Sequence, residues 1–158
     1  MPIGQNKRRH FGRPSLKNII KIKEGSILEQ LVDFIRNNDA SFYGKGVDYK
    51  KVLYAENVLN TSFSEEYKNY LLNFGTVAYD GHELTGISED NDYNDVVKIT
   101  LEERDKFKDK IFKNLYVIEK TYIDDIIIWQ STNGAIYQSQ PQSAIHKIAD
   151  SIIEFLQL

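Results

Sequence analysis

Apolar residues recur at helical spacing in three segments of the first half of the chain. Residues 26–35 begin with the spacing of a capping box and continue with apolar positions three and four apart, which predicts a helix. A shorter helix is expected at 48–58. A third helix is expected at 62–74, because serine and first-turn glutamates suit the positive end of a helix dipole and Gly75 can end the helix. The segment 40–46 contains two glycines and is expected to be a connector.

Shorter apolar runs predict strands in the rest of the chain. The segments 76–79 and 83–87 flank Asp80-Gly81, a dipeptide favoured in tight hairpin turns. Three further runs are rich in β-branched and aromatic residues, at 115–119, 126–130 and 135–138. Asn133-Gly134 lies between the last two runs and is the strongest short-range hairpin signal in the sequence. The pattern therefore predicts two hairpins.

Polar and amphipathic segments complete the pattern. The acidic stretch 88–95 is expected to be an exposed loop, and 96–111 has the spacing of a solvated amphipathic helix. Apolar positions at helical spacing from 143 to 156, just after Pro141, predict a C-terminal helix with His146 on its outer face. This order of elements predicts an α+β fold, a single domain with a largely antiparallel sheet flanked by helices.

The length of 158 residues fits one domain with a real core. The chain has no cysteine, which excludes disulfides, thiolate zinc sites, iron–sulfur clusters and cysteine nucleophiles. Its longest apolar runs have four residues, whereas a membrane helix needs about twenty. No membrane segment and no secretory signal are expected, which favours a cytoplasmic protein.

Charge divides the chain into two parts. Residues 1–23 hold seven basic residues and no acidic one, whereas the remaining residues hold 13 basic and 23 acidic residues, a net charge of −10. We expect a basic N-terminal arm over residues 1–25 and a folded domain over 26–158. The alternative interpretation of the arm, a nucleic-acid contact, has only a short basic cluster in its favour.

Candidate chemistry is sparse. The stretch from Asp90 to Asp95 opens like a calcium-binding loop, but the EF-hand pattern needs glycine at its sixth position and glutamate at its twelfth, where this chain has Asp95 and Leu101. His82 has acidic neighbours that could orient a general base, yet the chain has no nucleophile elbow. Gly44-Lys45-Gly46 lacks the rest of a phosphate-binding loop. The residues favour a binding domain without metal or cofactor over an enzyme.

One stretch is similar to a known family signature. Residues 63–75 resemble the L-P-x-x-Y-K-x-F-L-x-x-x-G-G signature of the SUKH superfamily, also called the Smi/Knr family. Ser64 stands where the family usually has proline, and Thr76 stands where it usually has the second glycine. The resemblance covers about residues 26–157. It assigns structural roles to eight residues: Phe63, Tyr67, Leu71, Phe74, Gly75, Gly86, Trp129 and Gly134.

The resemblance also implies a function. Small bacterial members of this family are immunity proteins that bind polymorphic toxins, many of them nucleases, and block them without catalysis. The acidic body agrees with a basic toxin as partner. Six acidic residues are the candidate partner-binding set: Asp80, Glu83, Glu89, Asp90, Asp92 and Asp95. Two alternatives remain open: an acidic loop that only keeps the protein soluble, and a regulatory scaffold like the eukaryotic relatives associated with cell-wall control.

Overall fold

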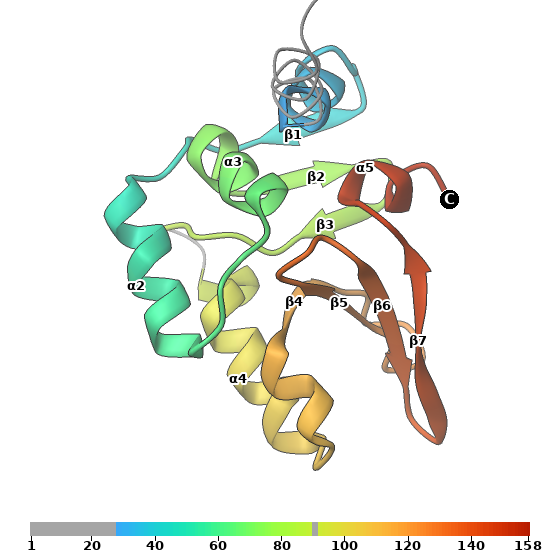
Figure 1. The fold of residues 1–158 in the computed structure, drawn as a ribbon. Helices are drawn as coiled ribbons and strands as arrows, with labels where there is room; N and C mark the ends of the chain where they lie inside the picture. The colour runs from blue at the N-terminus through green and yellow to red at the C-terminus, as the bar shows by residue number, and fades with distance from the viewer. Residues whose placement is uncertain (1–27, 90–91) are drawn as a thin grey trace, which may run out of the picture.

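The computed structural model describes residues 28–89 and 92–158 (Figure 1). The expected basic arm therefore lies outside the described residues. The helix expected at 26–35 is observed over residues 28–36, and it buries Leu31 and Ile35. The elements that follow are β1 Ser41–Tyr43, α2 Tyr49–Leu59, α3 Glu65–Phe74, β2 Val77–Tyr79, β3 His82–Leu84, η1 Asp92–Asn94, α4 Val96–Lys106, η2 Lys110–Asn114, β4 Leu115–Lys120, β5 Ile127–Ser131, β6 Ile136–Gln140, β7 Ser143–Ala149 and α5 Ile152–Phe155.

Local side chains begin and end the helices of the first half. Asp48 caps α2 by accepting a hydrogen bond from the backbone N–H of Lys50. Ser64 caps α3 by accepting from the backbone N–H of Tyr67, so the helix begins at Glu65, three residues later than the sequence predicted. Gly75 ends α3 with a φ of 70°, a backbone conformation that favours glycine.

The first sheet has three antiparallel strands in the order β1-β2-β3. Its predicted hairpin is confirmed, and both turn residues have positive φ, 44° at Asp80 and 86° at Gly81. The expected connector at 40–46 is wrong in part, because β1 lies within it. Ser41 pairs with Tyr79, far away in the chain, so local sequence carries no signal for this strand.

The second sheet has four antiparallel strands in the order β4-β5-β6-β7. Its first predicted pair is confirmed: Ile128 lies opposite Gln138, and Trp129 lies opposite Tyr137. A register shift between Val117 and Glu119 marks a β-bulge in β4. The sheet that the sequence predicted as one is therefore two antiparallel sheets within one α+β domain.

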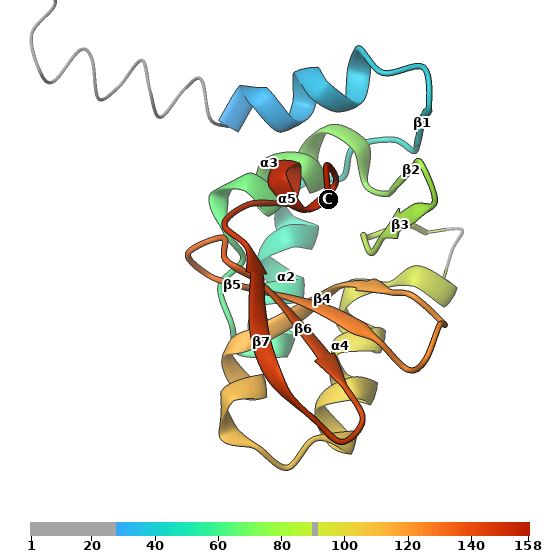
Figure 2. The ribbon, with the colours of Figure 1, turned by 90° about the vertical axis from the view of Figure 1, so that its right-hand side faces the viewer.

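Apolar side chains cover both faces of the four-stranded sheet. Ile118 and Ile128 belong to the larger core, which α2, α3 and the helix at 28–36 share. Val117 and Trp129, their neighbours in the chain, belong to a smaller core with Ile99 of α4 and residues of η2. Figure 2 shows this sheet in front of α2 and α4, with the helix at 28–36 along the top of the molecule.

Two helices predicted for the second half are wrong in extent. The segment predicted as a C-terminal helix forms strand β7 first, with His146 exposed on it, and only Ile152–Phe155 is helical. Ile145 packs on the smaller core and Ile148 on the larger one, because positions three apart lie on opposite faces of a strand. Partial burial of Ile145 and Ile148 on opposite faces thus imitates helical spacing. The helix predicted at 96–111 ends at Lys106, and η2 follows. Among the described residues, every helix is too short or too polar to cross a bilayer.

Candidate partner-binding surface

Three glycines let separate backbone segments touch beside the end of α3. A Cβ atom at Gly86 would lie 1.7 Å from the carbonyl oxygen of Gly75, and one at Gly46 would lie 1.9 Å from that of Leu72. We call the close approach of Gly86 to Gly75 the crossing. The segment after β3 leaves the crossing and returns to it, because the N–H of Gly86 donates to the carbonyl of Asn94 and the N–H of Val96 donates to the carbonyl of Gly86. Gly75 and Gly86, two of the motif glycines, therefore hold loops together. Gly46 of the Gly44-Lys45-Gly46 segment takes part in this close packing.

The other motif residues form the interior. Phe63, Tyr67, Leu71 and Phe74 are 0–1 % exposed. The hydroxyl of Tyr67 bonds to Thr85, 2.9 Å from its carbonyl oxygen, which ties α3 to the segment that follows β3. Burial raises the pKa of Tyr67 well above its usual value, so this hydroxyl stays protonated.

Trp129 and Gly134 serve the second sheet. Trp129 is fully buried, and its indole Nε1 donates to the Oγ of Ser139 at 2.8 Å. Gly134 has a φ of 95° in the β5–β6 turn and accepts a hydrogen bond from the side chain of Gln130. All eight motif residues thus lie in the scaffold, and none lies on an exposed binding face.

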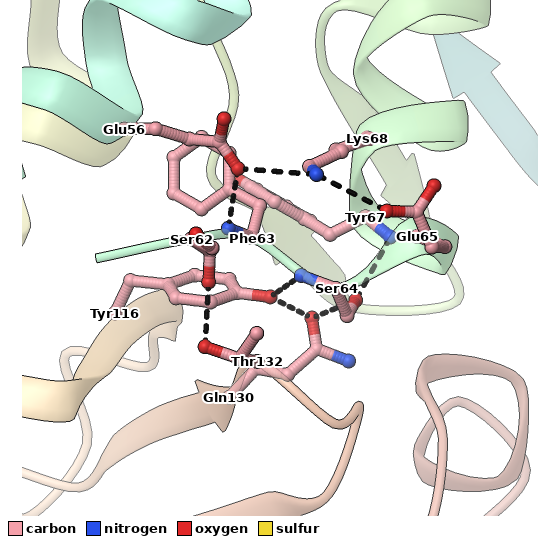
Figure 3. Close-up of polar contacts among 10 residues, drawn as sticks. All are labelled: Glu56, Ser62, Phe63, Ser64, Glu65, Tyr67, Lys68, Tyr116, Gln130 and Thr132. Carbon is pink, nitrogen blue, oxygen red and sulfur yellow. Dashed lines mark hydrogen bonds and ion pairs between the residues drawn. The ribbon is translucent and has the colours of Figure 1, made fainter.

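The serine that replaces the family's proline lies in a buried polar network (Figure 3). The backbone N–H of Ser64 donates to the hydroxyl of Tyr116 at 2.8 Å, a bond that proline could not make. The Tyr116 hydroxyl donates to Oε1 of Gln130 at 2.7 Å, and Ser64 Oγ lies 3.1 Å from the same oxygen. The network joins the start of α3 to β4 and β5. The serine that replaces proline therefore has hydrogen-bond partners in Tyr116 and Gln130.

The network continues on the solvent side through charged residues. Glu56 accepts from the backbone N–H of Phe63 at 2.7 Å, and Lys68 lies between Glu56 and Glu65, at 3.4 Å and 3.1 Å (Figure 3). Thr132 donates to the carbonyl of Ser62 at 2.8 Å. These contacts fix the connection between α2 and α3.

Thr76, the other departure from the family pattern, needs no glycine. The positive φ of this turn belongs to Gly75, and Thr76 has none. The turn after α3 therefore accommodates threonine at this position.

A buried carboxylate joins the two sheets. Glu119 is 4 % exposed. Its Oε2 lies 3.0 Å from Nδ1 of His82, and its Oε1 accepts a hydrogen bond from the backbone N–H of Glu83 at 2.8 Å. The hydrogen bond to Glu119 raises the pKa of His82, burial opposes this rise, and the charge of Asp80 adds to it. His82 therefore has a structural partner.

The acidic candidates whose side chains the structure describes have different surroundings. Asp80 is exposed in the β2–β3 turn, and the exposed carboxylate of Glu83 accepts a hydrogen bond from the hydroxyl of Tyr93. Glu89 is exposed and paired with Lys51, so part of the acidic loop is neutralised.

The remaining three candidates have different positions. Asp95 caps α4 by accepting from the backbone N–H of Lys98 at 2.9 Å. Asp92 begins η1, and Asp90 lies outside the described residues. The structure therefore places Asp95 at the N-cap of α4, whereas the sequence had suggested it as a partner-binding residue.

Exposed apolar side chains gather next to Glu83. Phe42, Tyr93, Tyr122 and Ile123 are 75 %, 53 %, 63 % and 65 % exposed. Phe42, Tyr93 and Glu83 line a cavity of about 290 Å³. Tyr93 and Glu83 also line a second cavity of about 730 Å³ with Tyr122 and Ile123, so the two cavities share these two lining residues. We call these five residues the aromatic–acidic face.

Sequence reasoning missed the apolar members of this face. Tyr93 is the one apolar residue of the acidic loop, and Tyr122-Ile123 interrupts a polar turn before Asp124-Asp125. Apolar residues in otherwise polar loops were the available signal. No such signal marked Phe42, because strand β1 was not predicted.

The comparisons with known proteins agree with the fold. The sequence model of a protein family described as SMI1-KNR4 cell-wall (SUKH_6) matches residues 50–156. This range contains the eight motif residues and all six acidic candidates. No curated protein matches the chain. Within the described residues, no three histidine, aspartate or glutamate side chains are placed to hold a metal ion.

Proposed function

Because the chain belongs to the SUKH superfamily, we propose that it is an immunity protein, which binds a cognate toxin in the cytoplasm and neutralises it without catalysis. Family membership carries this proposal, since small bacterial members act in this way. The acidic composition beyond residue 23 supports a basic toxin, because opposite charges steer association.

The contacts of the buried carboxylates support binding rather than catalysis. Glu119 holds His82 and the backbone of Glu83, and Glu103 holds Lys106 at 2.7 Å and Lys120 at 2.9 Å. Thr121, a hydroxyl residue that lines the same cavity as His82, bonds to the backbone of its own loop at Ile123 and Ile126. These groups maintain the scaffold, and a hydroxyl nucleophile activated by His82 is not among their contacts.

The test of this function begins with the gene beside the one for this chain, which under this proposal encodes a protein with a toxin-like C-terminal domain. Co-expression should restore growth of cells that carry that domain, and the purified proteins should form a complex in calorimetry. A stoichiometric amount of the chain should abolish the toxin's activity in vitro. Continued killing and no complex would contradict the proposal. A neighbouring cell-wall operon and binding to its products would favour the regulatory scaffold instead.

A further inference from the structure

We infer that the aromatic–acidic face is the anchor of the toxin interface, and that it takes a basic protein segment whose arginine side chain enters the larger cavity. The inference rests on the proposed function and adds to it the place and the chemistry of contact. It also separates two roles. The acidic loop steers the approach, whereas the face holds the bound partner.

The exposed apolar residues favour an anchor at this position. Tyrosines and other large side chains, near the centre of an interface, contribute most of the affinity. Phe42, Tyr93, Tyr122 and Ile123 come from three separate parts of the chain and are more than half exposed. The two cavities that they line share Tyr93 and Glu83, so one partner segment can contact all of them.

The charges around the face specify a cation. Within the described part of the chain, no lysine or arginine lines either cavity, whereas Glu83 lines both and Glu119 lines the larger one. Asp80 is exposed in the adjoining turn, and Asp124 and Asp125 follow Ile123 in the same exposed loop. Glu119 already has partners in His82 and the backbone of Glu83, but a partner without positive charge would leave the exposed carboxylates of Asp80 and Glu83 without a compensating charge when the face is covered.

The side chains in the larger cavity suit a guanidinium in particular. Arginine stacks on aromatic rings and donates to carboxylates in a planar fork. The ring of Tyr122 lies 5.2 Å from the Nζ of Lys120, a cation–ring contact within the chain that an incoming guanidinium would join or replace. The hydroxyl of Tyr93 holds the Glu83 carboxylate, so the acceptor is oriented before the partner arrives.

Another exposed apolar surface offers a contrast. Tyr49, Leu53, Tyr54 and Val58 are exposed along α2, next to Lys50 and Lys51. This surface has basic neighbours and is not a match for a basic partner. Leu53-Tyr54 is, like Tyr122-Ile123, an adjacent pair of one tyrosine and one aliphatic residue, and it provides a matched control.

The first experiment uses a probe that does not depend on the toxin. N-acetylarginine amide is titrated into the isotope-labelled chain, and N-acetylcitrulline amide, its neutral analogue, is titrated in parallel. Arginine should shift the NMR signals of Tyr93, Tyr122 and Glu83 at millimolar concentration, citrulline should not, and Glu83→Gln should weaken the arginine effect at least threefold. Equal shifts with both probes, or equal arginine shifts at the exposed Glu102 of α4, would overturn the inference.

The second experiment uses the toxin domain encoded beside this chain. Replacing Tyr122 and Ile123 together by serine should raise the Kd for that domain at least 100-fold, mainly through faster dissociation. The Leu53→Ser, Tyr54→Ser control should change it less than threefold. Unchanged affinity of the Tyr122/Ile123 variant, with tight binding of the wild type, would overturn this inference and leave the proposed function intact. Absence of wild-type binding would overturn the proposed function, and with it the inference that a toxin segment binds to the aromatic–acidic face.

Discussion

The imidazole Nδ1 of His82 lies 3.0 Å from Oε2 of Glu119, and this contact connects the three-stranded sheet to the four-stranded sheet. His82 belongs to β3 and Glu119 to β4, just after the bulge. The same carboxylate accepts from the backbone N–H of Glu83, so one buried group positions the strand that carries the acidic member of the aromatic–acidic face.

This contact should make stability depend on pH. The pKa of His82 is raised above 6.5, mainly by its hydrogen bond to Glu119. A group whose pKa is raised by folding contributes all of its stabilisation below the unfolded pKa and loses it as pH rises through the folded pKa. The wild type should therefore exceed His82→Gln in free energy of unfolding at pH 6, and the difference should shrink by pH 9. Urea unfolding across this range measures it. The control His146→Gln, at an exposed site on β7, should leave the profile unchanged; parallel profiles for wild type and His82→Gln would contradict the prediction.

Two glycines should respond differently to alanine. At Gly86 a Cβ would collide with the backbone of Gly75, and overpacking of this kind destabilises by about 1–3 kcal/mol or more. Gly81 has open space around it but a φ of 86°, where a side chain adds strain of about 1–2 kcal/mol. Gly86→Ala should be the more destabilised of the two in urea unfolding. The reverse order would show that the crossing can relax.

The fold was predictable where apolar patterns are local. The β2–β3 hairpin depends on Asp80-Gly81 and the β5–β6 hairpin on the turn at Asn133-Gly134, and both turn signals lie in adjacent residues. β1 was missed because its pairing with Tyr79 depends on a distant segment. β7 was mistaken for a helix because the partly buried Ile145 and Ile148, three positions apart, pack on opposite faces of the strand and so imitate helical spacing.

The candidate site was predictable only in part. Charge identified Asp80 and Glu83 as exposed residues, but it could not distinguish them from Asp95, whose carboxylate caps a helix. The pairing of Glu89 with Lys51 also depends on the folded structure, since the two residues are far apart in sequence. The sequence therefore identified the acidic side of the surface but not its apolar members.

The Ser64–Tyr116 contact should be measurable by mutation. Tyr116→Phe removes the acceptor of the buried Ser64 N–H and should destabilise the protein by about 1–3 kcal/mol. Ser64 has a φ of −64°, which proline adopts, but a proline ring would crowd the Tyr116 hydroxyl. The double variant Ser64→Pro, Tyr116→Phe should therefore be more stable than the sum of the single effects predicts. Strict additivity in chemical unfolding would contradict this, and the exposed Tyr54→Phe serves as control.

Large side chains in the two cores should be sensitive to truncation. Phe74 and Trp129 are fully buried, and replacing either by alanine should lower the free energy of unfolding by about 3–5 kcal/mol. Trp129→Ala also leaves the Oγ of Ser139 without its donor. Calorimetric melting should show a large fall for both variants. Tyr54→Ala, 69 % exposed, should stay within about 0.5 kcal/mol of wild type.

Neutralising the acidic loop should slow association with a basic toxin. The variant replaces Glu89, Asp90, Asp92 and Asp95 by glutamine or asparagine, and asparagine at position 95 can still cap α4. Steering charges act mainly on association rate and are screened by salt, so the rate should fall and its salt dependence should flatten. Stopped-flow kinetics at two salt concentrations measure both. Equal rates and equal salt slopes would remove the loop from the interface and favour a role in solubility alone.

The crossing at Gly86 has a consequence for how such a protein can diversify. Gly86 bonds to both Asn94 and Val96, so the acidic loop leaves the scaffold and rejoins it at nearly the same point. Its length is therefore decoupled from the register of the sheets, and doubling it would add only about 0.6 kcal/mol of closure entropy. Insertions between Ser88 and Tyr93 should therefore leave the register of both sheets unchanged, so the loop can change in length while Tyr93 keeps its contact with Glu83.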